Sequence, residues 1–156
     1  MSQQGIRGYY QLTSTIEEQL RGTEFTNTVS IGDISKVNLN KQDIFPLAHM
    51  IVNSVTAEEQ VLRFNISILA CDIVDQSKDI TTDRFTGNDN EQDILNTQLL
   101  VLNKLIQKLR MGSLHTDMYQ IDGDPTLTPF SDRFENELAG WTADITILIY
   151  NDIYIC

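Results

Sequence analysis

The sequence predicts an α+β protein in which two main helices pack on one face of an antiparallel or mixed β-sheet. Two segments place apolar residues three and four positions apart, which is the period of a helix, and most other apolar residues follow the two-residue period of a strand. Short polar links join consecutive strands, which favours antiparallel pairing. A length of 156 residues suits one core, so residues 1–156 are expected to form a single domain.

The first helix is predicted over residues 6–21. Its apolar face consists of residues at helical spacing, namely Ile6, Tyr9, Leu12, Ile16 and Leu20. Gly22 follows and is suited to the C-terminal cap. Residues 26–39 are rich in Thr, Ser, Val and Ile, and they are expected to hold one or two short strands at a sheet edge.

A long antiparallel hairpin is predicted from strands at 47–55 and 61–74 joined by the polar link 56–60. The even positions of the second strand form a continuous apolar face: Leu62, Phe64, Ile66, Ile68 and Ala70. Its odd positions change from polar to apolar along the strand, in the order Arg63, Asn65, Ser67, Leu69, Cys71 and Ile73. The half of the hairpin away from the 56–60 link is therefore expected to be covered on both faces.

The second helix is predicted over residues 91–111, after a polar linker at 75–93. Asn90 is suited to the N-cap, and Lys104, Lys108 and Arg110 gather near the C-terminal end, as the helix dipole favours.

The last third of the chain is predicted to be mainly β. Residues 126–138 are ambiguous between helix and extended chain, and Ala139-Gly140 is expected to form a turn. A strand is predicted from Trp141, with Ala143, Ile145, Ile147 and Ile149 on one face and continuing through Ile153 and Ile155.

The net charge of −11 argues against binding to phosphate backbones or anionic membranes. No apolar run approaches the length of a membrane span, and the N-terminus lacks a signal-peptide pattern, so an intracellular product is expected. Cys71 has the pattern of a small buried residue, and Cys156 that of an exposed one. A bridge between them is not expected in a reducing compartment.

No catalytic motif stands out. Neither His49 nor His115 has a partner at metal-ligand spacing, and no phosphate-loop or nucleophile-elbow pattern occurs. The acidic run at 88–93 lacks the glycine and distal glutamate of a calcium loop, so it is interpreted as a solvated linker. Asp122-Gly123-Asp124 is interpreted as a turn. No metal or other cofactor is expected.

One enzymatic alternative stays open. Asp132, Glu135 and Glu137 precede Trp141, and a pair of these carboxylates could serve a sugar-cleaving site. A polar rim around one aromatic anchor is the preferred interpretation, and the chain is expected not to be an enzyme.

The apolar content exceeds what a monomer needs, which indicates packing between subunits. The residues proposed for that interface are Ile51, Val52, Leu69, Phe130, Phe134, Trp141, Ile153 and Tyr154. Tyr9 and Tyr10 are further candidates.

The order of segments resembles the small neck and tail-ring proteins of tailed bacteriophages, similar to the tail-terminator and tail-completion (head-tail connector) family. The likeness rests on the leading helix, the long hairpin, the helix that opens at 88–94, and the closing run RFENELAGW at 133–141. Runs of this kind also resemble virion proteins of short-tailed phages related to the crAss-like group. The likeness covers nearly the whole chain as an arrangement of elements and carries no catalytic residue.

The resemblance implies a virion structural protein that forms a hexameric or dodecameric ring between portal and tail. Genomic DNA would pass through that ring without sequence-specific binding, and an acidic lumen would let it slide. The ring would contact the portal and adjacent neck or tail proteins, with no membrane, and the subunit would reside in host cytoplasm during assembly. The hairpin is expected to reach the neighbouring subunit and the 75–93 linker an adjacent ring. A tail hub or tube subunit and a small non-viral adaptor module remain the alternatives.

Overall fold

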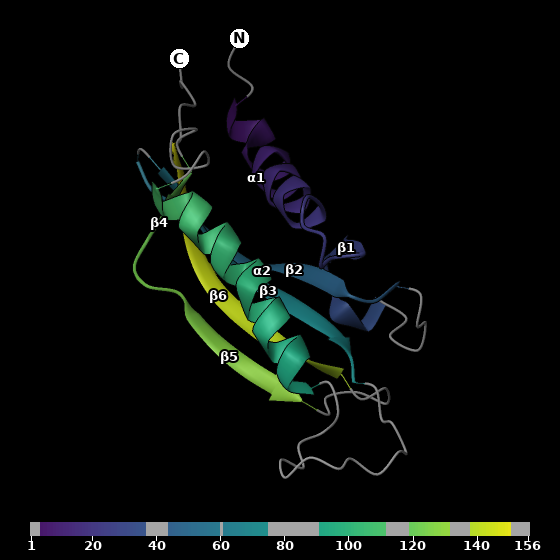
Figure 1. The fold of residues 1–156 in the computed structure, drawn as a ribbon. Coiled ribbons are helices and arrows are strands. Elements are labelled where there is room, and N and C mark those ends of the chain that lie inside the picture. The colour runs from purple at the N-terminus through teal and green to yellow at the C-terminus, as the bar shows by residue number, and fades with distance from the viewer. Residues whose placement is uncertain are drawn as a thin grey trace, which may run out of the picture.

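The computed structural model describes residues 4–36, 44–59, 61–74, 91–111, 119–131 and 138–150. It shows an α+β fold in which two helices pack against a six-stranded mixed sheet (Figure 1). The helices are α1 (Gln4–Arg21) and α2 (Glu91–Met111). The strands are β1 (Thr28–Ile31), β2 (Leu47–Ala57), β3 (Val61–Ile73), β4 (Gln120–Ile121), β5 (Thr126–Ser131) and β6 (Leu138–Tyr150), and a 3-10 turn, η1 (Ile34–Lys36), follows β1.

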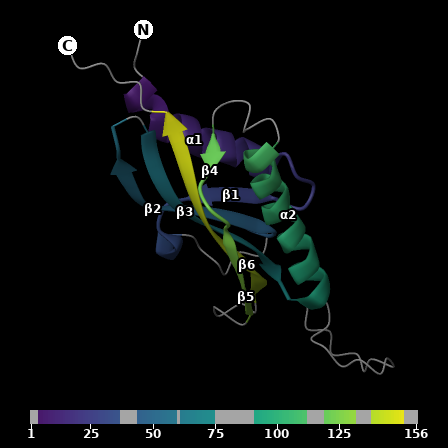
Figure 2. The same ribbon diagram turned by 90° about the vertical axis from the view of Figure 1, so that its left-hand side faces the viewer.

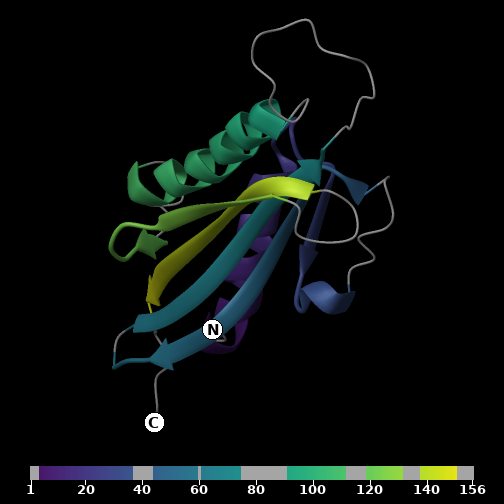
Figure 3. The same ribbon diagram turned by 90° about the horizontal axis from the view of Figure 1, so that it is seen from below.

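The sheet has the order β1-β2-β3-β6-β4, and β5 also pairs with β6. Strands β2, β3 and β6 are antiparallel and lie side by side through the middle of the molecule (Figure 2). The predicted edge strand is β1, and it runs parallel to β2, which makes the sheet mixed. Seen from below, β2 and β5 lie on opposite sides of the central pair β3 and β6 (Figure 3).

Both helices cover the same face of the sheet, as the order of the elements predicts. Leu12 and Ile16 of α1 and Leu102 of α2 share one core with the even positions of β3. Helix α1 ends where Gly22 donates its backbone N–H to the carbonyl of Glu18 at 2.9 Å. Helix α2 spans the residues that the sequence predicts.

The opposite face carries a second, smaller core at one end of the hairpin. It is built from Phe45, Leu47, Leu69, Cys71, Phe130 and Leu138. The prediction that this half of the hairpin is covered on both faces is therefore confirmed. We call residues 47–50 and 68–73 the proximal half of the hairpin, and residues 51–57 and 61–67 the distal half.

The predicted turn at Ala139-Gly140 is wrong, because both residues lie inside β6. Gly140 pairs with Cys71, and a Cβ on Gly140 would lie 2.0 Å from the carbonyl oxygen of Ala70 and 2.7 Å from the Cα of Cys71. Glycine is required here because the backbones of β3 and β6 approach closely, which is a known reason for glycine inside a strand.

The ambiguous segment after residue 126 is extended as far as the structure describes it. Thr126–Ser131 forms β5, whose Pro129 has no N–H to offer and therefore suits an edge strand. Between β4 and β5 the chain turns at Gly123, which has a φ of 72°. The carboxylate of Asp122 bonds Arg63 of β3, and that of Asp124 bonds Arg110 of α2 at 2.7 Å. The Asp-Gly-Asp segment is thus a turn held by ion pairs.

Candidate functional site

The distal half of the hairpin has an open edge. Strand β1 pairs with residues 47–50 of β2 and ends there, at the bond from the Gly32 N–H to the Met50 carbonyl of 3.0 Å. Among the described residues, no strand pairs with residues 51–57 on that side. These residues are half-buried at 51 and 52 and exposed from 53 to 57.

A β-bulge interrupts this edge. Val52 pairs with Ile66 and Ser54 pairs with Asn65, so Asn53 is the extra residue. A bulge bends the strand and reverses the alternation of its side chains. As a result Val55 lies beside Phe64 on the helix-covered face, where its side chain is 45% exposed.

The distal half is polar on the face away from the helices. Two rows of side-chain hydrogen bonds cross β2, β3 and β6 there. In one row Asn53 Nδ2 donates to Ser67 Oγ at 2.7 Å, and Ser67 Oγ donates to Asp144 Oδ1 at 2.7 Å. In the other, Asn65 Nδ2 donates to Ser54 Oγ at 2.8 Å and Thr146 Oγ1 donates to Asn65 Oδ1 at 3.0 Å.

Arg63 lies at the outer end of the same polar face. Its guanidinium bonds Glu58 at 3.1 Å and also bonds Asp122, and these two hydrogen bonds raise the pKa of Arg63. The face therefore holds a fixed pattern of hydrogen-bonding groups with acidic groups around its single described cation. It is a mainly polar surface, with the half-buried side chains of Ile51 and Leu148 beside Ser67 and Arg63.

The residues proposed for an interface differ in how deeply the structure buries them. Leu69 and Phe130 are each 8% exposed and pack within the chain as part of the second core, so they offer little surface to a neighbour. Ile51 and Val52 are half-buried at the start of the open edge. Trp141 is half-buried, and its indole N–H donates to the Leu95 carbonyl at 2.7 Å.

Three of the proposed interface residues, Phe134, Ile153 and Tyr154, lie outside the described residues. The same holds for the carboxylates of the enzymatic alternative, for His115, and for most of the 75–93 linker.

Exposed aromatics lie near the distal half. Tyr9 and Tyr10 are 42% and 72% exposed on α1, with their rings edge to face at a centroid distance of 5.8 Å. Gly8, the preceding residue, lies against Leu62 of the distal half, since a Cβ on it would be 3.7 Å from Leu62 Cδ1. Tyr9 and Tyr10 thus add exposed aromatic surface next to the turn of α1 that meets Leu62 of β3.

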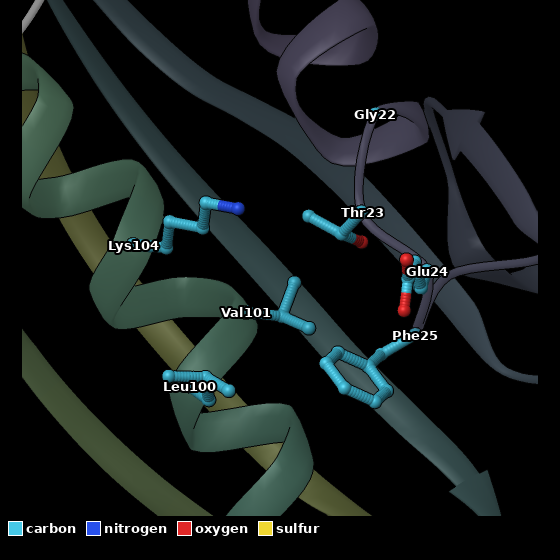
Figure 4. Close-up of a pocket in the computed structure, with 7 residues that line it drawn as sticks. All are labelled: Gly22, Thr23, Glu24, Phe25, Leu100, Val101 and Lys104. Atoms are coloured by element: carbon cyan, nitrogen blue, oxygen red, sulfur yellow. The ribbon is translucent and has the colours of Figure 1, made fainter.

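A hollow lies between the end of α1 and the outer side of α2 (Figure 4). Its volume is about 430 Å³, and its lining comprises Gly22, Thr23, Glu24, Phe25, Leu100, Val101 and Lys104. A neighbouring hollow of about 290 Å³ shares Glu24 and Phe25 and is otherwise lined by Pro46, Asp72, Asp93, Ile94, Thr97 and Gln98. Sequence reasoning missed both, because their walls come from segments far apart in the chain.

His49 forms a structural link. It is fully buried, its Nε2 lies 2.6 Å from the Gly32 carbonyl, and its Nδ1 lies 2.6 Å from Ser30 Oγ. Because Nε2 faces a carbonyl acceptor, this nitrogen carries the proton. Burial lowers the pKa of His49, and the ring connects β2 to β1 and to the turn after it.

The described residues show no arrangement for metal or thiol chemistry. No group of three His, Cys, Asp or Glu side chains within them could hold a metal ion. Burial raises the pKa of the Cys71 thiol to about 12, so the reactive thiolate is not formed at neutral pH.

No protein-family model matches the chain, and no curated protein matches it. Within the described ranges, neither helix is long and apolar enough to cross a membrane.

Proposed function

We propose that this chain is a structural subunit that assembles with copies of itself through the distal half of the hairpin. In the setting that the sequence resembles, the assembly is a ring of a tailed-phage neck or tail, through which DNA passes. The chain acts there without catalysis. A hub or tube subunit of the same particle uses the same surface.

The observation that carries the proposal is the open edge of β2 at residues 51–57. An unpaired strand edge pairs readily with another chain, and natural proteins usually block such edges with proline, charge, a β-bulge or a covering segment. The opposite edge of the sheet is blocked in this manner. It consists of two separate short strands, β4 and β5, and β5 contains Pro129. Of the blocking features, the described part of the β2 edge has only the bulge at Asn53. Residues 51–57 themselves contain neither proline nor a charged residue.

The direction of the free backbone groups follows from two hydrogen bonds. The Met50 carbonyl accepts from Gly32 of the β1 side, whereas the Glu58 N–H donates to Val61 of the β3 side at 2.9 Å. Backbone groups alternate in direction along a strand. Counting back from Glu58, Ala57 and Val55 direct their N–H and carbonyl groups away from β3 and toward the open side.

The charge of the chain is compatible with a DNA channel. With a net charge of −11, a ring of these subunits would repel phosphates, so DNA would slide past its wall. The polar rows around Asp144 add hydrogen-bonding groups and one carboxylate to the face away from the helices.

The test is the mass in solution of three chains, measured by light scattering over a range of protein concentration. The wild-type chain and Val55→Thr, which keeps the N–H and the branched side chain, should both form a discrete hexamer or dodecamer. Val55→Pro removes one outward N–H without touching the β3 ladder, and it should remain monomeric.

A wild-type chain that stays monomeric at every concentration contradicts the proposal. Rings of unchanged mass formed by Val55→Pro contradict the role of the edge. A dimer that dissociates in Val55→Pro would favour the adaptor module as the function.

A further inference from the structure

The two hollows beside the Thr23–Phe25 turn form one groove with unlike ends. They share Glu24 and Phe25, so the groove runs along α2 from Lys104 at one end to Asp93 at the other. Lys104 and the 23–25 turn face each other across the larger hollow in Figure 4.

The middle of the groove is apolar and open. Phe25 is 44% exposed and Leu100 is 51% exposed, and the buried side chain of Val101 lies between them at the base. Figure 4 shows the Phe25 ring beside Val101. Together they leave contiguous apolar surface on which one aliphatic or aromatic side chain can rest.

The smaller hollow is acidic and lacks a counter-charge. Glu24, Asp72 and Asp93 line it, and no lysine or arginine among the described residues does. Within the described part of the chain none of the three forms an ion pair. Asp72 is half-buried, and its one hydrogen bond with a described residue is accepted from the Ile73 N–H at 2.8 Å. Burial raises the pKa of Asp72, and that bond opposes the rise.

Gln98 provides an independent indication of a ligand. Its side chain is only 2% exposed and forms part of the wall of the same hollow. Among the described residues its amide makes no side-chain hydrogen bond. Among the described residues, Thr142 Oγ1 is the only fully buried side-chain polar atom without a partner, so the Gln98 amide keeps access to the hollow and an occupant there can bond it.

We propose that this groove binds a partner protein through a lysine or arginine that lies next to an apolar residue. The cationic group enters the acidic hollow and pairs with Asp72 and Asp93, with one N–H directed to the Gln98 amide oxygen. The apolar neighbour rests on Phe25 and Leu100. Lys104 determines the orientation of the bound segment, because its positive charge repels the cationic side chain from the other end of the groove.

The site is separate from the open edge of β2 and does not depend on assembly. Its occupant is a second protein of basic character, which the net charge of −11 would also attract over a distance. The binding test therefore measures peptide binding to a single subunit. Its outcome is independent of the oligomer mass measured by light scattering.

The probe is the capped dipeptide acetyl-leucyl-arginine amide, followed by NMR of the Gln98 side-chain amide and the Leu100 and Val101 methyl groups. The matched control contains citrulline, which has the shape of arginine without its charge. The arginine peptide should shift these signals saturably, and the citrulline peptide should bind about tenfold more weakly, equivalent to about 1.4 kcal/mol.

Two variants distinguish the ends of the groove. Asp72→Asn keeps the side-chain shape and should weaken the arginine peptide while leaving the citrulline peptide unchanged. Leu100→Ala should weaken both peptides by the same factor. Equal binding of the two peptides, shifts confined to other residues, or no saturable shift would overturn the proposal.

Discussion

The two halves of the β2–β3 hairpin share one pair of strands but have opposite surroundings. In the proximal half, β1 pairs with β2, the helices cover one face, and the second core covers the other. In the distal half the edge is open among the described residues, and the face away from the helices carries the exposed polar rows. The proximal half is thus covered within the chain, whereas the distal half keeps the edge that the proposed assembly would use.

The difference between the two halves predicts different contributions to stability. Buried apolar side chains in the part of the sheet that is covered on both faces contribute most of the hydrophobic free energy. The rows of polar side chains on the open face contribute little. Substitutions should therefore have large effects on unfolding in the proximal half and small ones in the distal half.

The largest effect is expected from Gly140→Ala, opposite Cys71 in the proximal half. The new Cβ would meet backbone atoms of Ala70 and Cys71 that cannot move without separating β3 from β6. We expect a loss of about 3 kcal/mol or more in the free energy of unfolding, measured by denaturant titration.

Gly8→Ala is the matched control over the distal half. Its Cβ would make an ordinary contact with Leu62 at 3.7 Å, and alanine should stabilise α1 by up to about 1 kcal/mol. Equal losses in the two variants would contradict the close-approach explanation.

Truncation of apolar side chains should follow the same division. Leu69→Ala removes a buried side chain from the second core and should cost about 2–4 kcal/mol of unfolding free energy. Val55→Ala, at a side chain that is 45% exposed, should cost less than about 1 kcal/mol. Similar costs, measured by thermal or denaturant unfolding, would show that the two halves are buried alike.

The proximal half should also be sensitive to acid through His49. Because the pKa of His49 is lowered in the folded chain, the unfolded chain takes up a proton first as the pH falls below 6.5. Stability should therefore decrease below that pH and be retained above it. The difference between the wild type and His49→Gln, followed by unfolding from pH 7 to pH 5, isolates this contribution.

Asp72 acts in the opposite sense. Its raised pKa makes the folded chain bind the proton more tightly, so its contribution to stability falls as the pH rises above 3.8. For His49, a difference between wild type and His49→Gln that stays constant from pH 7 to pH 5 would show that His49 does not titrate as its burial indicates.

The smallest effect is expected in the polar rows. Ser67→Ala removes both bonds of one row, yet these groups face water in the distal half, so the loss should stay below about 1 kcal/mol. Denaturant unfolding measures it. A loss as large as that of Leu69→Ala would mean that the rows are part of the core.

Much of this fold follows from local patterns. The alternation of residues 62–70 predicts the face that the helices cover, and the change from Ser67 to Leu69 predicts where the second core begins. Helix α2 matches its predicted bounds because its period, caps and charge order all agree.

Other features could not be predicted from neighbouring residues. Gly140 has the composition of a turn, but its place in β6 depends on the distance to Ala70. Leu69 and Phe130 suggested an interface because they are apolar, and only the second core shows that they pack within the chain. The groove joins residues from the α1–β1 turn, β3 and α2, so no single segment indicates it.

The sequence by itself determined the class of the fold, the two helices and the two-sided cover of the proximal half, because periodicity and capping act over a few residues. The tertiary structure decided where β1 stops, how the Asn53 bulge turns Val55 toward the helix side, and which carboxylates face Gln98. These depend on strand register and on contacts between distant segments, since a shift of one residue in register moves every side chain to the other face.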